Sequence, residues 1–306
     1  MKSYRLIALF LIFLLGCSIS MSAVDYCASS AFGYGSSATG GGSATPVQVN
    51  SVSELKSALG SKAKNKVVII TKDLTFTSML TIQDAQNITL MALPGVKLIS
   101  NQQDASTSGI LLVKKSSNVI IRNLTFVGPG AYDCNGNDNL CFEKVTTAWV
   151  DHCDFQDGCD GNFDNKGNTD NVTVSWCRFR YLKAPKSGGE TDDHRFTNLL
   201  GSSASDKPSD GTFNFTWAYC WWDEGCVERM TRCRNCEQHF INCYWNSSVS
   251  KCYIGPENAK CYFEGCTFAG KANSAKNIFK SYGGTNACKF VNCSGNIPSN
   301  SGTVTT

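Results

Sequence analysis

Short segments in which apolar and polar residues alternate recur along most of the chain. They are rich in β-branched and aromatic residues, and each lies beside Gly, Asn, Asp or Ser, which is typical of strands that end in turns. Helical periodicity is rare, apart from an amphipathic stretch at 53–59. The strands predicted from this pattern lie at 67–70, 88–91, 119–121, 148–150, 172–175 and 213–216.

A second pattern, a cysteine followed by any residue and then an aromatic residue, repeats along the chain. The intervals from cysteine to cysteine are 24, 43, 23 and 23 residues. A period of this size with a short set of strands in each unit predicts a β-solenoid, in which equivalent residues stack from coil to coil. The alternative is a disulfide-rich β-sandwich with accidental spacing. The 43-residue interval predicts one coil with a long loop at 183–211. The repeats begin at Cys153, Cys177, Cys220, Cys243 and Cys266.

The first residues predict an export signal. Lys2 and Arg5 precede an apolar run at 6–15, which is too short to span a bilayer. We therefore expect residues 1–23 to be removed, which leaves a single secreted domain at 24–306. The residues before Cys17 also resemble a bacterial lipoprotein box, so an acylated Cys17 and an outer-membrane location are the alternative. No later stretch is long and apolar enough for a membrane span.

The net charge is close to zero. It is +3 for the whole chain and +1 without Lys2 and Arg5, because that segment contains no acid. A near-neutral chain without a basic run argues against a nucleic-acid partner, and we expect a monomer.

The chain contains 17 cysteines. Export and the even number left after Cys17 predict some disulfides, with Cys134/Cys141 and Cys153/Cys159 as close pairs that could join loops. Cysteines that stack from coil to coil are instead expected to be buried, free thiols. The CxxC pair at 233–236 lacks the second pair that a zinc site needs.

Two groups of residues could carry chemistry. Asp138, Asp160 and Asp164 lie in stretches rich in Gly and Asn, where carboxylates suit a hard cation such as Ca²⁺, although Asx turns would explain them equally well. Arg232 and Arg234 would share one face of a strand, and Arg229 the other unless the chain bends between them. A solvated charged surface is the simpler explanation of these arginines.

Several motifs together resemble the pectate lyase family, which includes pectate lyases and pectin lyases (polysaccharide lyase family 1). Their order and spacing agree with that family, and the similarity extends from about residue 31 to about residue 246. The motifs are WxDHxxF at 149–155, VTxSW at 172–176, LxGSS at 199–203 and, with one change, RxPxxR at 229–234.

The resemblance implies a right-handed parallel β-helix, an all-β fold whose loops form a substrate groove, and calcium-assisted β-elimination of polygalacturonate. Carried over to this chain, it implies that Asp138, Asp160 and Asp164 bind Ca²⁺ and that Arg229 is the base. It further implies that Arg234, with Arg232 beside it, binds substrate. A substrate-binding lysine is expected between the second and third motifs, where Lys183, Lys186 and Arg195 are the candidates.

The chain departs from the family pattern at three places. Thr231 replaces the proline of the arginine motif, Gly136 replaces a further acidic ligand, and the cysteine repeat lies where relatives commonly stack asparagine. Two other functions stay open at this point. One is a pectin lyase that acts on methylated substrate without calcium, and the other is a non-catalytic β-helix that binds glycan. A glycoside hydrolase is disfavoured because Asp192-Asp193 and Asp223-Glu224 lack the sequence surroundings of such an enzyme.

Overall fold

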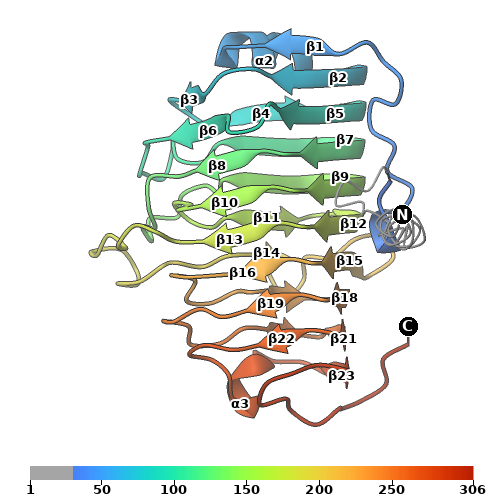
Figure 1. Cartoon of the computed structure of the whole chain (residues 1–306), viewed down its shortest axis with the longest axis vertical. Helices are drawn as coiled ribbons and strands as arrows, with labels where there is room; N and C mark the ends of the chain where they lie inside the picture. Colours follow the sequence, from blue (N-terminus) through green and yellow to red (C-terminus); the bar gives the residue numbers. More distant parts are fainter. Residues whose placement is uncertain (1–29, 306) are drawn as a thin grey trace, which may run out of the picture.

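The strands of the protein stack on one another in parallel, coil upon coil, as the computed structural model of the chain shows (Figure 1). The structure describes residues 30–305. The predicted export signal at 1–23 and Cys17 lie outside the described residues. Within residues 30–305, no helix is both long and apolar enough to cross a bilayer.

The first face of the stack is a long parallel sheet. Each strand pairs with its equivalent one coil further on, so the sheet follows the whole length of the molecule (Figure 1). All six strands predicted from the alternating pattern are in this face. In spatial order the strands are β1 (Val47–Val49), β2 (Lys64–Ile70), β5 (Gln86–Ala92), β7 (Leu111–Arg122), β9 (Leu140–Asp151), β12 (Asp170–Ser175), β15 (Phe213–Ala218), β18 (Cys236–Ile241), β21 (Lys260–Glu264) and β23 (Ala287–Val291).

The second face is a separate parallel sheet of short strands. A residue with a left-handed backbone conformation, such as His152 (φ 50°) or Trp176 (φ 52°), precedes each cysteine of the repeat and bends the chain from the first face to the second. In chain order the strands are β3 (Leu74–Phe76), β6 (Lys97–Ser100), β8 (Thr125–Val127), β10 (Asp154–Gln156), β13 (Arg178–Arg180), β16 (Trp221–Trp222), β19 (Tyr244–Trp245) and β22 (Thr267–Phe268).

A third row of strands pairs with the N-terminal halves of β7 and β9. Asp164 of this row lies opposite Cys141 of β9, and Leu199 lies opposite Arg232 in the next coil. The three faces together form the parallel β-helix that was predicted, and the rule that parallel crossovers are right-handed gives its hand. The strands of this row are β4 (Leu80–Gln83), β11 (Phe163–Lys166), β14 (Leu199–Leu200), β17 (Arg232–Arg234) and β20 (Gly255–Glu257).

The cysteine–aromatic repeat forms two ladders inside the coils. The aromatic residues of β10, β13, β16, β19 and β22 are in register and stack, with ring centroids 5.0 Å apart for Phe155–Phe179 and 4.6 Å for Trp222–Trp245. Ladder thiols are buried and donate weakly to backbone carbonyls, as Cys177 does to Ser175 at 3.3 Å. The register of successive coils therefore confirms the period read from the sequence.

Two expectations about cysteines and loops need correction. All 15 cysteines in the described part of the chain are free, so neither Cys134/Cys141 nor Cys153/Cys159 is a disulfide. Cys153 cannot reach a loop because its side chain points into the core as a member of the ladder. The interval 183–211 is not one loop, because β14 lies inside it and divides it into two excursions.

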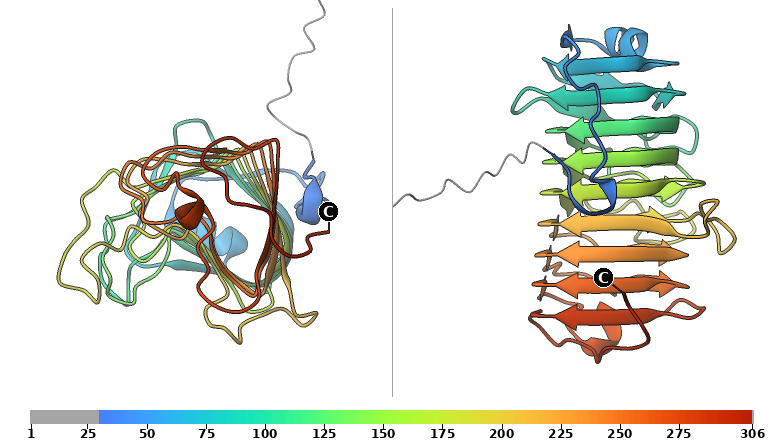
Figure 2. Two further views of the ribbon diagram at one scale, coloured as in Figure 1. Left: turned by 90° about the horizontal axis from the view of Figure 1, so that it is seen from below. Right: turned by 90° about the vertical axis from the view of Figure 1, so that its right-hand side faces the viewer.

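Helices close the ends of the stack. α2 (Val52–Leu59) coincides with the predicted amphipathic stretch and buries Leu55 and Leu59 against the first coil. Its N-cap Ser51 accepts a hydrogen bond from Glu54 N–H at 3.2 Å. The short helix α3 (Ala275–Ile278) covers the other end (Figure 1). The segment with the 3₁₀ turn η1 (Gly33–Gly35) runs along the outside of the first face toward β1 (Figure 2).

Candidate functional site

The three aspartates named from the sequence lie close together beside β9 and β11. Asp138 lies two residues before β9, Asp164 lies in β11, and Asp160 lies in the turn between β10 and β11. The backbone fixes this arrangement because Asn139 N–H donates to the Gly161 carbonyl at 3.1 Å, and Leu199 N–H donates to Asp164 Oδ1 at 2.9 Å. All three side chains line one cavity of about 230 Å³.

The space between these carboxylates is kept open by a glycine. A Cβ atom on Gly161 would lie 2.6 Å from Asp138 Oδ1 and 3.2 Å from Asp164 Oδ1. Asp138 Oδ1 is buried and makes no hydrogen bond within the described residues. A buried carboxylate oxygen that lies near a second carboxylate and accepts no hydrogen bond is poorly stabilised by the protein alone.

The pKa values of the two buried carboxyls are raised. Burial raises the pKa of Asp138 well above its usual range, and the nearby Asp164 and Asp160 raise it further. Burial likewise raises the pKa of Asp164 to about 7, although Arg229 acts in the opposite direction. A divalent cation between them would remove this penalty. The donor set, which consists of carboxylate oxygens, therefore fits Ca²⁺.

The departure at Gly136 has a structural reason. A Cβ atom there would lie 2.7 Å from Ser108 Oγ and 3.2 Å from Cys159 Sγ, so a fourth acid would not fit without a shift of its neighbours. The candidate ligand set in this chain is therefore three aspartates.

Arg229 lies near the acids and acts on them electrostatically. It lies three residues before β17 in a left-handed conformation (φ 60°), so the strand alternation of β17 does not extend to it. Its guanidinium carbon lies 4.6 Å from the centre of the Phe196 ring. Its charge partly offsets the rise in the pKa values of Asp138 and Asp164, so Arg229 is within electrostatic reach of both acids.

Arg232 and Arg234 share one face of β17, as the alternation predicts. Both pair with Glu257 on β20, Arg232 Nη2 at 3.4 Å and Arg234 Nε at 2.9 Å. Arg234 Nη1 also donates to the Gly201 carbonyl at 2.7 Å. The protein thus holds Arg234 by two contacts, and Arg232 stacks on the Tyr282 ring at 4.2 Å.

The three basic residues that the sequence offered as substrate-binding candidates do not line the acidic cavity. Lys183 Nζ donates to the Gly128 carbonyl at 2.6 Å, Lys186 Nζ lies 4.1 Å from the Tyr132 ring centre, and Arg195 pairs with Asp193 at 2.6 Å. The cation that does line it is Lys166, which the sequence reasoning missed. Its signal is the two-residue spacing from Asp164 in one strand, which places both on the same face.

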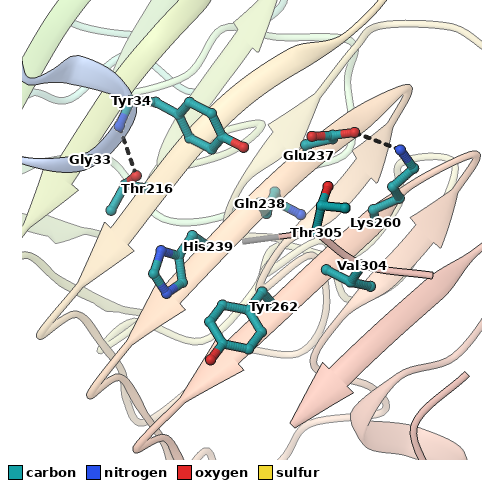
Figure 3. Close-up of a pocket in the computed structure, with 10 residues that line it drawn as sticks. All are labelled: Gly33, Tyr34, Thr216, Glu237, Gln238, His239, Lys260, Tyr262, Val304 and Thr305. Atoms are coloured by element: carbon teal, nitrogen blue, oxygen red, sulfur yellow. Dashed lines mark hydrogen bonds and ion pairs between the residues drawn. The ribbon is translucent and has the colours of Figure 1, made fainter. Parts of the chain in front are cut away.

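A second cavity lies outside the first face, between η1 and residues 304–305 (Figure 3). Tyr34, His239 and Tyr262 line it, and its two charged residues, Glu237 and Lys260, pair with each other at 2.7 Å (Figure 3). It offers no group of unpaired carboxylates, so the cavity of the third row is the stronger candidate for metal-assisted chemistry.

The fold and the acidic cavity of the third row define a parallel β-helix protein in which three aspartates and Lys166 line one cavity, with Arg229 within electrostatic reach of the acids. The chain belongs to the pectate lyase family, because the family model described as pectate lyase matches residues 5–306. The family inferred from the motifs is thereby confirmed.

Individual relatives are consistent with that assignment. The chain is 26% identical over 190 residues to the pectate trisaccharide-lyase of Thermotoga maritima, a match that covers 60% of this chain and 46% of the relative. It is 34% identical over 114 residues to pectate lyase B of Paenibacillus amylolyticus, which covers 35% of this chain and 27% of that protein. The chain spans less than half the length of these curated relatives.

Solved structures share the fold. A pectate lyase variant from Xanthomonas campestris superposes with a TM-score of 0.64 at 19% identity, and the match covers 90% of this chain and 86% of that one. At 19% identity, this similarity supports the shared fold alone.

Proposed function

We propose that the protein is a secreted pectate lyase that cleaves (1→4)-α-D-galacturonan by calcium-assisted β-elimination. The observation that carries this proposal is the meeting of three aspartates at one cavity beside Arg229, with two of the carboxyls buried and their pKa values raised. Membership of the pectate lyase family supports the substrate class.

Asp138, Asp160 and Asp164 would hold the calcium ion in this proposal. The bound ion would neutralise a uronate carboxylate and acidify the proton on the adjacent C5. Lys166, which lines the same cavity, contributes a positive charge for the negatively charged sugar chain. Arg234 is held by Glu257 and the Gly201 carbonyl, and together with Arg232 it extends this positive surface along the third row.

Arg229 would remove the C5 proton. The electron pair of the C5–H bond forms the C4–C5 double bond, the C4–O bond breaks, and the leaving oxygen takes up a proton. Guanidinium groups hold their proton up to high pH, so this chemistry is expected to be faster under alkaline conditions. The Phe196 ring lies against the guanidinium, and this cation–π contact favours the observed position of the side chain.

The proposal is tested by ultraviolet absorbance of the unsaturated product on polygalacturonate, with calcium and with excess chelator. We expect product only with calcium, and a loss of most activity in Asp138→Asn, because that change removes a charge from the cavity. Asp192→Asn, on an exposed loop, is the matched control and should retain activity. Undiminished cleavage in chelator would refute the calcium requirement. Cleavage restricted to methylated pectin would identify a pectin lyase instead.

A further inference from the structure

A buried histidine lies next to the acidic cavity, in a place that the proposed function does not use. His194 is 6% exposed and lies between two carboxylates, with Nδ1 3.2 Å from Asp133 Oδ2 and Nε2 3.2 Å from Asp160 Oδ1. One donor atom from each of these three side chains lies within 4.8 Å of the others. The sequence gives no hint of this grouping, because the three residues are up to 61 positions apart.

The two ring nitrogens of His194 differ in their contacts. Nδ1 faces Asp133 and the hydroxyl of Thr191, which lies 3.4 Å away. Nε2 is buried and makes no hydrogen bond within the described residues, although Asp160 Oδ1 is only 3.2 Å away. The direction of the Nε2 atom therefore does not suit a hydrogen bond to that oxygen, and a buried polar atom is left without a partner.

The distance between Nε2 and Asp160 Oδ1 suits two ligands of one metal ion. Tetrahedral zinc binds nitrogen and carboxylate oxygen at about 2.0–2.2 Å, so two of its ligands lie roughly 3.3–3.5 Å apart. Asp133 would then serve as the outer carboxylate that accepts from Nδ1–H and fixes the ring, which is the usual support of a metal-bound histidine. We propose that His194 and Asp160, with Asp133 behind the histidine, form a site for a divalent transition metal such as Zn²⁺.

The surroundings favour nitrogen and oxygen donors over sulfur. Among the described residues, the ligand atoms that lie within 4.8 Å of one another here come from Asp133, Asp160 and His194, and no thiol belongs to this group. The Asp160 side chain is 26% exposed, which gives an ion and its remaining water ligands a way in. An imidazole nitrogen favours zinc, cobalt or nickel over calcium, which prefers oxygen ligands alone.

The proposed site lies between two loops of the protein. Asp133 follows β8, and His194 comes from the first excursion of the long coil, seen at the side of the stack in Figure 1. Glu190 N–H donates to the Asp133 carbonyl at 3.2 Å, and Asn135 Nδ2 donates to Glu190 Oε1 at 3.2 Å, so the loops already lie together without an ion. A metal bound by His194 and Asp160 would connect this loop to the turn that contains Asp160, which is also a proposed calcium ligand.

Asp160 belongs to both sites, so the transition metal and calcium should compete. This consequence rests on the proposed function, whereas the metal site itself does not. Binding to His194 draws Asp160 toward the histidine and away from Asp138 and Asp164. Zinc is therefore expected to raise the calcium concentration needed for half-maximal activity.

The test is a titration of the metal-free, full chain with Co²⁺, followed by the visible d–d absorption of the bound ion. We expect one site with tetrahedral bands, no binding in His194→Gln, and a loss of about 10–100-fold in affinity in Asp133→Asn. His239→Gln is the matched control, since this histidine lies on β18 and pairs with Glu264 at 3.4 Å. Unchanged Co²⁺ binding in His194→Gln, or no binding by the wild type, would overturn the proposal, as would an intense thiolate charge-transfer band.

Two further measurements separate this site from the proposed calcium site. Asp138→Asn should lose the calcium response but retain the Co²⁺ spectrum, and Asp160→Asn should lose both. A crystal soaked in zinc should give an anomalous peak between His194 and Asp160. A peak elsewhere, or none, contradicts the site even if a buried-histidine variant fails to fold.

Discussion

At the scale of single residues, Arg229 is the side chain on which turnover should depend most. It touches the Phe196 ring and is held by no ion pair shorter than 4.0 Å within the described residues, unlike Arg232 and Arg234. Arg229→Lys keeps the charge but shortens and reshapes the side chain, so we expect kcat to fall by at least about 100-fold with little change in stability. Lys260→Arg, on the first face, is the control. A kcat near that of the wild type would exclude Arg229 as the base.

The sequence motifs name the three acids and Arg229, which lie near one another in the structure, but they do not name the cation Lys166 beside the acids. The roles of these residues stay predictions. Asp138, Asp160 and Asp164 could be named because they lie in recognisable motifs, and the structure brings them to one cavity. Lys166 was missed although it lies two residues from Asp164. Alternation predicts that the two residues share a face of the strand, but it does not predict that this face borders a cavity. Arg195, a candidate for substrate binding, pairs locally with Asp193 and does not line the cavity, so its role stays a prediction.

At the scale of elements, the cysteine ladder should contribute to stability through packing. Burial raises the pKa of the Cys177 and Cys243 thiols, and both are fully enclosed between coils. Cys243→Ala leaves a small cavity, so we expect the free energy of unfolding to fall by roughly 1–2 kcal/mol. Urea denaturation measures this change.

The partly exposed Cys134 provides the control for that measurement. Cys134→Ala should have a smaller effect, because its side chain is less enclosed. Iodoacetamide should label Cys134 in the native protein and the ladder thiols only after unfolding. Disulfide-linked ladder peptides in a non-reducing mass spectrum would contradict the free thiols.

The elements could be predicted from the sequence as far as local patterns extend. The period of 23–24 residues gave the coils, because stacked positions must have compatible side chains. The sequence did not reveal β14, since Leu199–Leu200 is too short to alternate and is positioned by pairing with Asn165 and Cys233 on neighbouring coils. The free thiols also follow from tertiary placement, which the number and spacing of cysteines do not determine.

At the scale of the whole molecule, the buried acids should make stability depend on pH and calcium together. Burial raises the pKa of Asp164 to about 7, whereas in the unfolded chain it titrates near 4. Between these values the folded protein binds more protons than the unfolded one. Stability of the metal-free protein should therefore fall as pH rises through this window, by on the order of a few kcal/mol.

Calcium should reverse this dependence, because the ion binds the ionised carboxylates and replaces their protons. We expect calcium to raise Tm more at about pH 8 than at about pH 5, where Asp164 is protonated in the folded state. Differential scanning calorimetry with calcium and with chelator at both pH values measures the difference. In Asp164→Asn the pH dependence of the calcium effect should largely disappear, while in Asp192→Asn it should persist. An equal calcium shift at both pH values would mean that the ion binds away from these buried acids.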